Sequence, residues 1–202
     1  MQRKKRPPND QGSRQRLLAG ADRLLRRNGY SGTPLSAIAA EGRAPMGSVY
    51  FHFPGGKEQL VGEAMRYGCQ EVLDGLRRAL ESSADPAKGL AACAKAWAED
   101  LERSNWEDGC PVAATALQVS TTSEPLRLVS AEIMASWAAL IADYLERCGC
   151  TKKQASVSAE LALALLEGAE LLARIQRDRT PLDRAAIAMR SLLPARPQGS
   201  SS

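Results

Sequence analysis

The sequence predicts an all-α protein, and three observations support that prediction. Apolar residues make up 44% of the 202 residues and aromatic residues only 4%, while alanine and leucine, which are strong helix formers, are abundant. Apolar positions recur three and four residues apart along most of the chain, as on one face of a helix. No stretch shows the alternation of apolar and polar residues typical of a half-buried strand. We therefore expect a three-helix N-terminal module followed by a larger domain of about six helices.

Prolines, glycines and capping residues mark where the predicted helices begin and end. Proline suits the first turn of a helix, and a threonine or aspartate before it can cap the free amides. Glycine suits the position after a helix, which often needs a positive φ. On these signals, the sequence predicts helices over residues 13–28, two short segments within 34–53, and then 56–82, 86–104, 112–120, 124–148, 151–177 and 181–193.

The most informative segment is residues 33–58, where two short predicted helices flank a tight turn. In the first helix, Ile38 and its neighbours form a narrow apolar stripe that ends at Gly42, which lets the backbone leave the helix. In the second, Val49 and Phe53 stand four residues apart as buried anchors, which leaves small and polar residues on the opposite face. A helix with such a face after a tight turn fits the major groove of DNA.

This segment resembles the DNA-binding region of the TetR family of bacterial repressors, and the match extends over roughly residues 11–71. Two positions depart from the family pattern: Arg43 stands where a turn glycine is usual, and Met46 stands where lysine is frequent. A shorter match, over residues 108–113, is similar to the lincomycin-resistance-regulator subgroup, in which the Pro-Gly-Gly-Lys of residues 54–57 is also common. The family's motif positions are filled in register by Ile38-Ala39, Ala44-Pro45, Gly47-Ser48-Val49-Tyr50, His52-Phe53 and Lys57-Glu58.

Together with composition, the resemblance implies four regions along the chain. Residues 1–10 are expected to form a basic disordered arm, and residues 11–71 a TetR-type helix-turn-helix DNA-binding domain with its motif helices at about 34–53. Residues 72–194 are expected to form a helical effector-binding and dimerisation domain, followed by a disordered tail at residues 195–202.

Charge is divided unevenly along the chain. Residues 1–57 hold 11 Lys or Arg against three acidic residues, a balance of +8, whereas the remaining residues hold 16 against 20, a balance of −4. A basic module beside a groove-reading helix is the electrostatic pattern expected of a protein that binds duplex DNA. The basic run at residues 3–6 either enters a minor groove or only adds affinity.

We expect the DNA contacts to divide into those that position the protein on phosphates and those that read bases. Hydroxyl, imidazole and ammonium groups and helix-start amides suit phosphate oxygens. Arg43 is able to reach either a phosphate or a guanine, and Gly47 shares the outward face of the second motif helix. The predicted positioning residues are Thr33, Ser36, Tyr50, His52 and Lys57, and the predicted reading residues are Pro45, Met46, Ser48 and Phe51.

The middle helices are expected to hold an effector pocket. All three tryptophans fall between residues 97 and 137, a concentration that suits a flat or hydrophobic small molecule, although tryptophan at helical spacing is also common in a core. Glu170 is either a partner for a cationic group or half of a pair with Arg174, four residues on. The predicted pocket residues are Trp97, Leu101, Trp106, Leu117, Met134, Trp137, Tyr144 and Glu167.

The resemblance implies that the last two helices pair with those of a second copy in a four-helix bundle. Their apolar stripes agree with that assignment. The same pattern is expected of packing inside one chain, however, and periodicity does not separate the two. The predicted interface residues are Leu161, Leu165, Gly168, Leu172, Ile175, Leu182, Ala186 and Met189.

Other classes of site are not expected. The five cysteines lack the paired spacing of a zinc site, so no metal or other cofactor is predicted, and Cys148 and Cys150 are either a redox pair or simply buried thiols. The single histidine lies in the motif, and no nucleophile, phosphate-binding or metal-binding motif supports an enzyme. No apolar run reaches the roughly 18 residues of a membrane span, and the N-terminus lacks an apolar signal segment, which favours the cytoplasm.

These observations predict a ligand-responsive transcriptional regulator. We expect a repressor that binds a palindromic operator as a homodimer and is released by a small hydrophobic or aromatic molecule. One alternative, which Arg43 and Met46 leave open, is a ligand-binding or adaptor protein with degenerate DNA binding. The other is a small helical enzyme.

Overall fold

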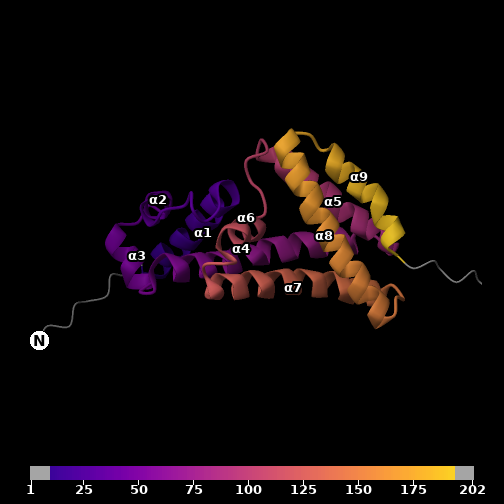
Figure 1. Cartoon of the computed structure of the whole chain (residues 1–202), viewed down its shortest axis with the longest axis horizontal. Helices are drawn as coiled ribbons and strands as arrows, with labels where there is room; N and C mark the ends of the chain where they lie inside the picture. Colours follow the sequence, from indigo (N-terminus) through magenta and orange to yellow (C-terminus); the bar gives the residue numbers. More distant parts are fainter. Residues whose placement is uncertain (1–9, 194–202) are drawn as a thin grey trace, which may run out of the picture. The chain divides into compact units, whose positions relative to one another are not determined.

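The computed structural model describes residues 10–193, and this part of the chain contains helices and connecting turns but no strand (Figure 1). The prediction of an all-α fold is confirmed. The expected arm at residues 1–10 and tail at residues 195–202 lie, apart from Asp10, outside the described residues. The elements are α1 (Asp10–Asn28), α2 (Leu35–Glu41), α3 (Met46–His52), α4 (Gly56–Glu81), α5 (Pro86–Arg103), α6 (Pro111–Val119), α7 (Glu124–Arg147), α8 (Lys152–Gln176), α9 (Thr180–Ala188) and the short 3₁₀ helix η1 (Met189–Leu192).

Capping residues explain several of the helix boundaries. The Asp85 carboxylate accepts a hydrogen bond from the Ala87 N–H at 2.9 Å and starts α5. Thr151 and Gln154 form a reciprocal capping box at the start of α8. Gly149 ends α7 with a φ of +97°, which a residue with a side chain rarely adopts. These local preferences are the reason that most predicted boundaries agree with the observed ones.

The two short motif helices begin differently from the prediction. Pro34 and Pro45 precede the first helical residue, with φ of −71° and −65° in extended conformations, so neither occupies the first helical position. Thr33 does not cap α2, because its hydroxyl donates to the Gly29 carbonyl at 2.8 Å. The fixed φ of proline at the cap position therefore sets both helix starts.

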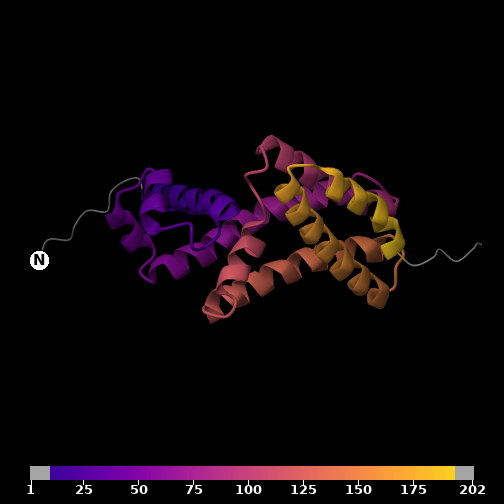
Figure 2. The same ribbon diagram turned by 45° about the horizontal axis from the view of Figure 1, so that its top comes forward.

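Contacts between residues divide the chain into two compact units. The first contains residues 10–71 and Asp108–Ile133, and in it α1 packs against α2, α3 and α6 while α2 packs against α3. The second contains Val72–Glu107 and residues 134–193, and in it α5, α8 and α9 pack against one another (Figure 2). Helices α4 and α7 each contribute residues to both units.

Each unit has its own apolar core. Burying one leucine-sized side chain stabilises a fold by roughly 1.5–3 kcal/mol, so each of these side chains helps to hold its own unit together. The fully buried side chains include Leu17, Leu25, Ile38, Val49, Phe53 and Leu60 in the first unit, and Leu90, Leu166, Leu182 and Met189 in the second.

Helix α7 is long and apolar enough to cross a membrane by length and composition, with a mean hydropathy of 1.4. This result contradicts the expectation that no segment would qualify. One side of this helix packs inside the protein, since Leu126, Ile133, Trp137 and Ile141 are each at most 2% exposed, whereas Leu128 is 53% exposed. A core helix that is apolar on much of its surface has the same composition as a membrane span.

Candidate DNA-binding surface and effector domain

Helix α3 buries one face and exposes the other. Val49 on the inner face and Phe53 just after the last turn are fully buried, as predicted for the anchors of a recognition helix. On the outer face, Met46 is 37% exposed, Tyr50 58% and Phe51 62%. Large apolar side chains exposed together are characteristic of interaction surfaces. Their concentration on a helix of only seven residues indicates a binding partner.

Gly47 lies on this face and is not explained by packing within the chain. A Cβ added at this position would meet no atom within 4 Å, and its φ is not positive. Glycine inside a helix costs about 1 kcal/mol relative to alanine. The open space at Gly47 therefore suits the close approach of another molecule. Pro45 beside it is exposed, and Ser48 is half-buried.

The turn between α2 and α3 depends on Arg43 and not on Gly42. The φ of Arg43 is +47°, in the left-handed region, whereas Gly42 has a φ of −76°. Gly42 therefore is not the residue that redirects the backbone. It is needed for close packing instead, because an added Cβ would lie 3.2 Å from the backbone of Arg16 in α1. The Arg16 Nε also donates to the Gly42 carbonyl at 3.1 Å, which fixes the turn against α1.

Two of the predicted phosphate contacts are engaged inside the protein. Thr33 is fully buried, with its hydroxyl bonded to backbone, so this side chain holds a loop and is not presented to a duplex. The Lys57 ammonium donates to the Tyr30 carbonyl at 2.7 Å and lies 4.1 Å from the centre of the Tyr30 ring. Partial burial lowers the pKa of Lys57. Both residues therefore position the loop after α1.

The other predicted contacts remain accessible to different degrees. Ser36, Arg43 and Tyr50 are exposed. His52 is half-buried, and its Nε2 lies 2.8 Å from the Ser13 hydroxyl of α1. That hydrogen bond ties the end of α3 to α1 and limits the orientations of the imidazole.

Helix α1 supplies a basic side chain that the sequence analysis did not single out. The Arg14 guanidinium lies 5.5 Å from the centre of the Phe53 ring and forms an ion pair with Glu63 of α4. A cation over an aromatic face is attracted to its negative charge. Arg14 therefore helps to fix the position of Phe53, the residue that follows α3.

A buried ion pair lies within α1, between Asp22 and Arg26, on the side that faces α4. Asp22 is 6% exposed and accepts from the Arg26 Nε at 2.9 Å, and Arg26 lies 3.6 Å from Glu71. Burial raises the pKa of Asp22, while the positive charge of Arg26 opposes that increase. Gly68 of α4 makes room for the pair, since an added Cβ would be 1.9 Å from the Asp22 carboxylate. The sequence does not indicate this pair, because Asp22 reads as an ordinary surface charge.

The second unit contains a buried donor that has no partner. Trp137 is fully buried, and its indole N–H makes no hydrogen bond with any of the described residues. Buried polar groups are nearly always hydrogen-bonded. Tyr144, which is 4% exposed, is different because its hydroxyl already donates to the Ser83 carbonyl at 2.8 Å. The Trp137 N–H is therefore available to an acceptor that residues 10–193 do not supply.

The other predicted pocket residues divide between the units. Leu101 is buried in the second unit, where Trp97, Trp106, Met134 and Glu167 are half-buried. Leu117 belongs to the first unit and is 81% exposed. It does not share this core, and its assignment to the pocket is therefore withdrawn.

A strained loop follows α5. Asn105 and Trp106 both have left-handed backbone conformations, with φ of 53° and 64°, which are uncommon for residues other than glycine. Arg174 of α8 holds the loop by donating to the Glu107 carbonyl at 2.6 Å and to the Trp106 carbonyl at 3.4 Å. Arg174, expected as a possible partner for Glu170, thus directs its guanidinium to this backbone.

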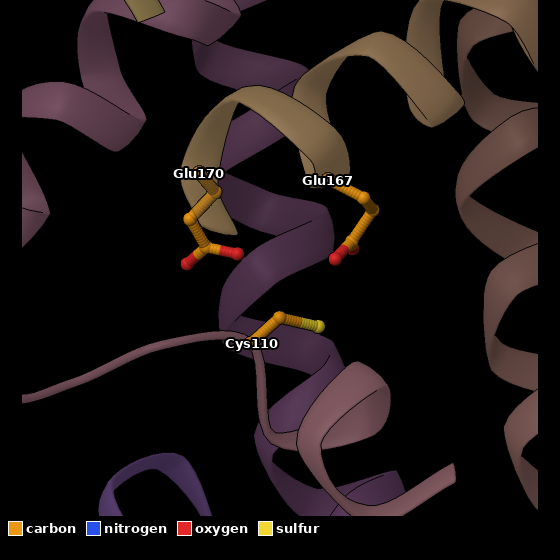
Figure 3. Close-up of side chains that lie close together, drawn as sticks. All are labelled: Cys110, Glu167 and Glu170. Carbon is orange, nitrogen blue, oxygen red and sulfur yellow. The ribbon is translucent and has the colours of Figure 1, made fainter. Parts of the chain in front are cut away.

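Acidic side chains also project from α8. Glu167 and Glu170 lie one turn apart, and their carboxylates point from the same side of the helix (Figure 3). Cys110, which Figure 3 also draws, caps the start of α6 by accepting from the Ala113 N–H at 3.4 Å.

Helices α8 and α9 both expose apolar side chains, and a groove lies between the two helices. Leu161 and Leu172 of α8 are 50% and 49% exposed, Ile175 is 70% exposed, and Ile187 of α9 is 79% exposed. The groove between the two helices has a volume of about 460 Å³. Its lining includes Leu165, Gly168, Leu172, Pro181, Arg184 and Ala188.

The predicted interface residues of the last helix are core residues instead. Leu182 and Met189 are fully buried and Ala186 is 8% exposed, because this side of α9 and η1 packs against α5 and α8. These three residues therefore pack inside the chain, which is the alternative that periodicity left open. Ile187, on the other side of α9, is the exposed apolar residue.

Comparison with known proteins places both halves of the chain in one family. Residues 17–64 match the family described as bacterial regulatory proteins of the tetR family, and residues 86–188 match the C-terminal domain described as transcriptional regulator LmrA/YxaF-like. The chain is 36% identical to the HTH-type transcriptional regulator LmrA of Bacillus subtilis (strain 168) over 170 residues, which cover 84% of this chain and 90% of that protein. It is 33% identical to the uncharacterized HTH-type transcriptional regulator Rv0196 of Mycobacterium tuberculosis, with 91% and 95% covered.

Solved structures support the same assignment. A TetR transcriptional regulator from Chloroflexus aurantiacus J-10-FL aligns with a TM-score of 0.75 at 26% identity, covering 92% of this chain and 96% of that one. A regulatory protein TetR from Rhodobacter sphaeroides has the same fold, with a TM-score of 0.79 at 21% identity and 90% and 99% covered. The resemblance to this family is thus confirmed. The chain belongs to the TetR family of DNA-binding transcriptional regulators, with an LmrA/YxaF-like C-terminal domain, and is not an enzyme.

Proposed function

We propose that the protein is a repressor that binds a palindromic operator as a homodimer and is released when a small hydrophobic or aromatic molecule binds its second unit. The observation that carries the proposal is helix α3, which buries Val49 and exposes Met46, Tyr50 and Phe51. A helix of this kind fits the major groove with its exposed face against the bases. The protein would act in the cytoplasm, where bacterial DNA is found.

The chemistry of the exposed face suggests what it reads. Met46 and Phe51 offer apolar surface and no hydrogen-bond donor, and apolar side chains recognise the methyl group of thymine in the major groove. Pro45 and Ser48 complete the reading surface, and Gly47 lets it approach the base edges closely. We therefore expect each operator half-site to carry thymine at the positions under this face.

Exposed polar groups around α3 would hold the protein on the phosphates. Ser36, Tyr50 and Arg43 are exposed, and Arg43 also has the reach to donate to a guanine. His52 and Lys57 act close to the duplex, where their contacts to α1 and Tyr30 fix the flanks of the helix. Contacts to phosphate set the register of the protein but carry no sequence information.

Dimerisation is proposed to occur through α8 and α9. Their exposed apolar residues and the groove between them are a surface that water solvates poorly. A second copy would cover Leu161, Leu172, Ile175 and Ile187 and bring two α3 helices to one DNA face. Gly168 has open space above it, which permits close helix approach.

The proposed effector enters the second unit next to Trp137. The unpaired indole N–H implies an effector that offers a hydrogen-bond acceptor, such as a carbonyl or ether oxygen, within an otherwise apolar or aromatic body. The aromatic side chain of Trp97 and the apolar side chains of Leu101 and Met134 lie in the same unit. Glu167 would receive a donor group of the effector.

Release is proposed to be a population shift. The effector must bind the form that does not fit DNA better than the form that does. Helix α4 is the proposed lever, because Gly56–Glu81 is one continuous helix that contributes residues to both units.

Selection of bound duplexes from a random DNA pool tests the proposal. The selected duplex is then titrated against a scrambled duplex at near-physiological salt. A palindromic consensus that binds at least ~10³-fold more tightly than the scramble is the expected result. Binding without a consensus would overturn the operator proposal.

A further inference from the structure

The junction between α7 and α8 places two cysteines one residue apart. Cys148 and Cys150 are both free and partly exposed, and Gly149 between them has a φ of +97°. The Cys150 N–H donates to the Leu145 carbonyl at 3.1 Å, and the Gly149 N–H donates to the Glu146 carbonyl at 2.9 Å. The glycine therefore reverses the direction of the chain at the end of α7, and the two cysteines lie in one short turn.

The end of α7 also fastens the loop that follows α4. The Cys148 thiol donates to the Ala84 carbonyl at 3.9 Å, and the Tyr144 hydroxyl donates to the neighbouring Ser83 carbonyl at 2.8 Å. Tyr144 lies directly over Gly89 of α5, since a Cβ added there would be 2.2 Å from its hydroxyl. Cys148 and Tyr144 thus both donate to the backbone of the loop between α4 and α5.

We propose that Cys148 and Cys150 form a redox-sensitive dithiol that a hydroperoxide oxidises to a disulfide. The thiolate of one cysteine attacks the peroxide, the O–O bond breaks, and a sulfenic acid forms with loss of one water. The thiolate of the second cysteine then attacks the sulfenic sulfur and displaces the second water. In total, two thiols and one hydrogen peroxide give one disulfide and two waters, and two electrons pass from sulfur to oxygen.

Oxidation would remove one fastening from the loop after α4. In a disulfide the two sulfur atoms are bonded to each other at about 2.05 Å, and neither carries a proton. Cys148 can then no longer donate to the Ala84 carbonyl. Helix α4 continues from this loop into the DNA-binding unit. The oxidised protein is therefore expected to bind its operator more weakly. Cys93 is not a competitor, because it is 1% exposed, whereas Cys148 and Cys150 are partly exposed.

Peptide mass spectrometry tests the disulfide directly. Trypsin cleaves after Arg147 and Lys152, and the peptide 148–152 contains both cysteines and no other. Treatment of the folded protein with hydrogen peroxide should lower the unreduced mass of this peptide by about 2 Da, and dithiothreitol should restore it. Cys93→Ser should behave like the wild type. An unchanged mass, or a bond from either cysteine to a different peptide, would overturn the proposal.

A second measurement tests the consequence for DNA. Oxidised wild-type protein should bind the selected duplex roughly 5-fold or more weakly than reduced protein, and Cys148→Ser should lose this difference while Cys93→Ser keeps it. Equal affinities of the oxidised and reduced wild type would refute the regulatory role. The peptide mass does not depend on DNA binding, so a failure of the repressor proposal can be told apart from a failure of the dithiol.

Discussion

At the scale of single residues, Arg43 carries strain in the recognition turn. Its φ of +47° lies in the left-handed region, where a side chain costs about 1–2 kcal/mol. Arg43→Gly is expected to raise the free energy of unfolding by about 1 kcal/mol, reduced somewhat by the extra freedom of glycine in the unfolded chain. Denaturant titration measures the change. Arg43→Ala is the matched control, because it removes the guanidinium and keeps the strain; the same gain in both variants would contradict the conformational explanation.

Gly68 is expected to be intolerant of even one methyl group. A Cβ at this position would overlap the buried Asp22 carboxylate, so Gly68→Ala must separate the Asp22–Arg26 pair or displace α4. We expect a loss of about 3 kcal/mol in the free energy of unfolding. Gly47→Ala, which meets open space, should leave stability unchanged or raise it by up to ~1 kcal/mol. Similar effects in the two variants would mean that the buried pair does not require Gly68.

At the scale of elements, helix boundaries and apolar stripes could be predicted, but the partner of each stripe could not. The stripe of Leu182 and Met189 was correctly identified as apolar. It faces the core of its own unit, because periodicity reports which side of a helix avoids water and not what covers that side. Thr33 illustrates the same limit at a helix start: a hydroxyl suited to a cap or a phosphate is in fact bonded to the Gly29 carbonyl.

Features that depend on contacts between residues far apart in the sequence could not be predicted from it. Val49 and Phe53 were predicted as anchors because four-residue spacing is a local property. The contact of Arg14 with Phe53 depends on the packing of α1 against the rest of the first unit. The burial of the Asp22–Arg26 pair depends on the same packing. The unpaired indole of Trp137 likewise depends on what surrounds it in the folded chain.

The exposed face of α8 makes a prediction about assembly. Leu172→Glu places a charge in the groove between α8 and α9 and should weaken the proposed dimer at least ~30-fold, because burying an unpaired carboxylate is costly. Sedimentation equilibrium measures the dissociation constant. Leu128→Glu, on α7 and 53% exposed, lies outside both helices of the proposed interface and should leave the dimer intact. A wild type that remains monomeric at micromolar concentration would contradict the interface.

At the level of the whole molecule, the proposed release mechanism couples an effector near Trp137 to DNA held by α3. Compounds that release the operator should share an aromatic body and a hydrogen-bond acceptor. Trp137→Phe keeps an aromatic side chain but removes the N–H together with the five-membered ring, and it should raise the concentration needed for release roughly 5-fold or more without changing affinity for DNA. Release is followed by fluorescence anisotropy of a labelled operator. Trp97→Phe is the control, because Trp97 is only half-buried. An equal rise in the effector concentration needed for release in both variants would mean that the acceptor of the effector does not bind the Trp137 N–H.

The central claim is that the exposed face of α3 reads DNA, and one comparison tests it most directly. Affinities for the selected operator and for a scrambled duplex are measured for wild type, Phe51→Ala and Tyr67→Ala; Tyr67 is a 47% exposed aromatic residue on α4, away from α3. Phe51→Ala is expected to lose about 1–3 kcal/mol of operator affinity and to keep its weak affinity for the scrambled duplex. Tyr67→Ala is expected to match the wild type on both duplexes. Equal operator affinities for Phe51→Ala and Tyr67→Ala would contradict the assignment of α3 as the reading surface.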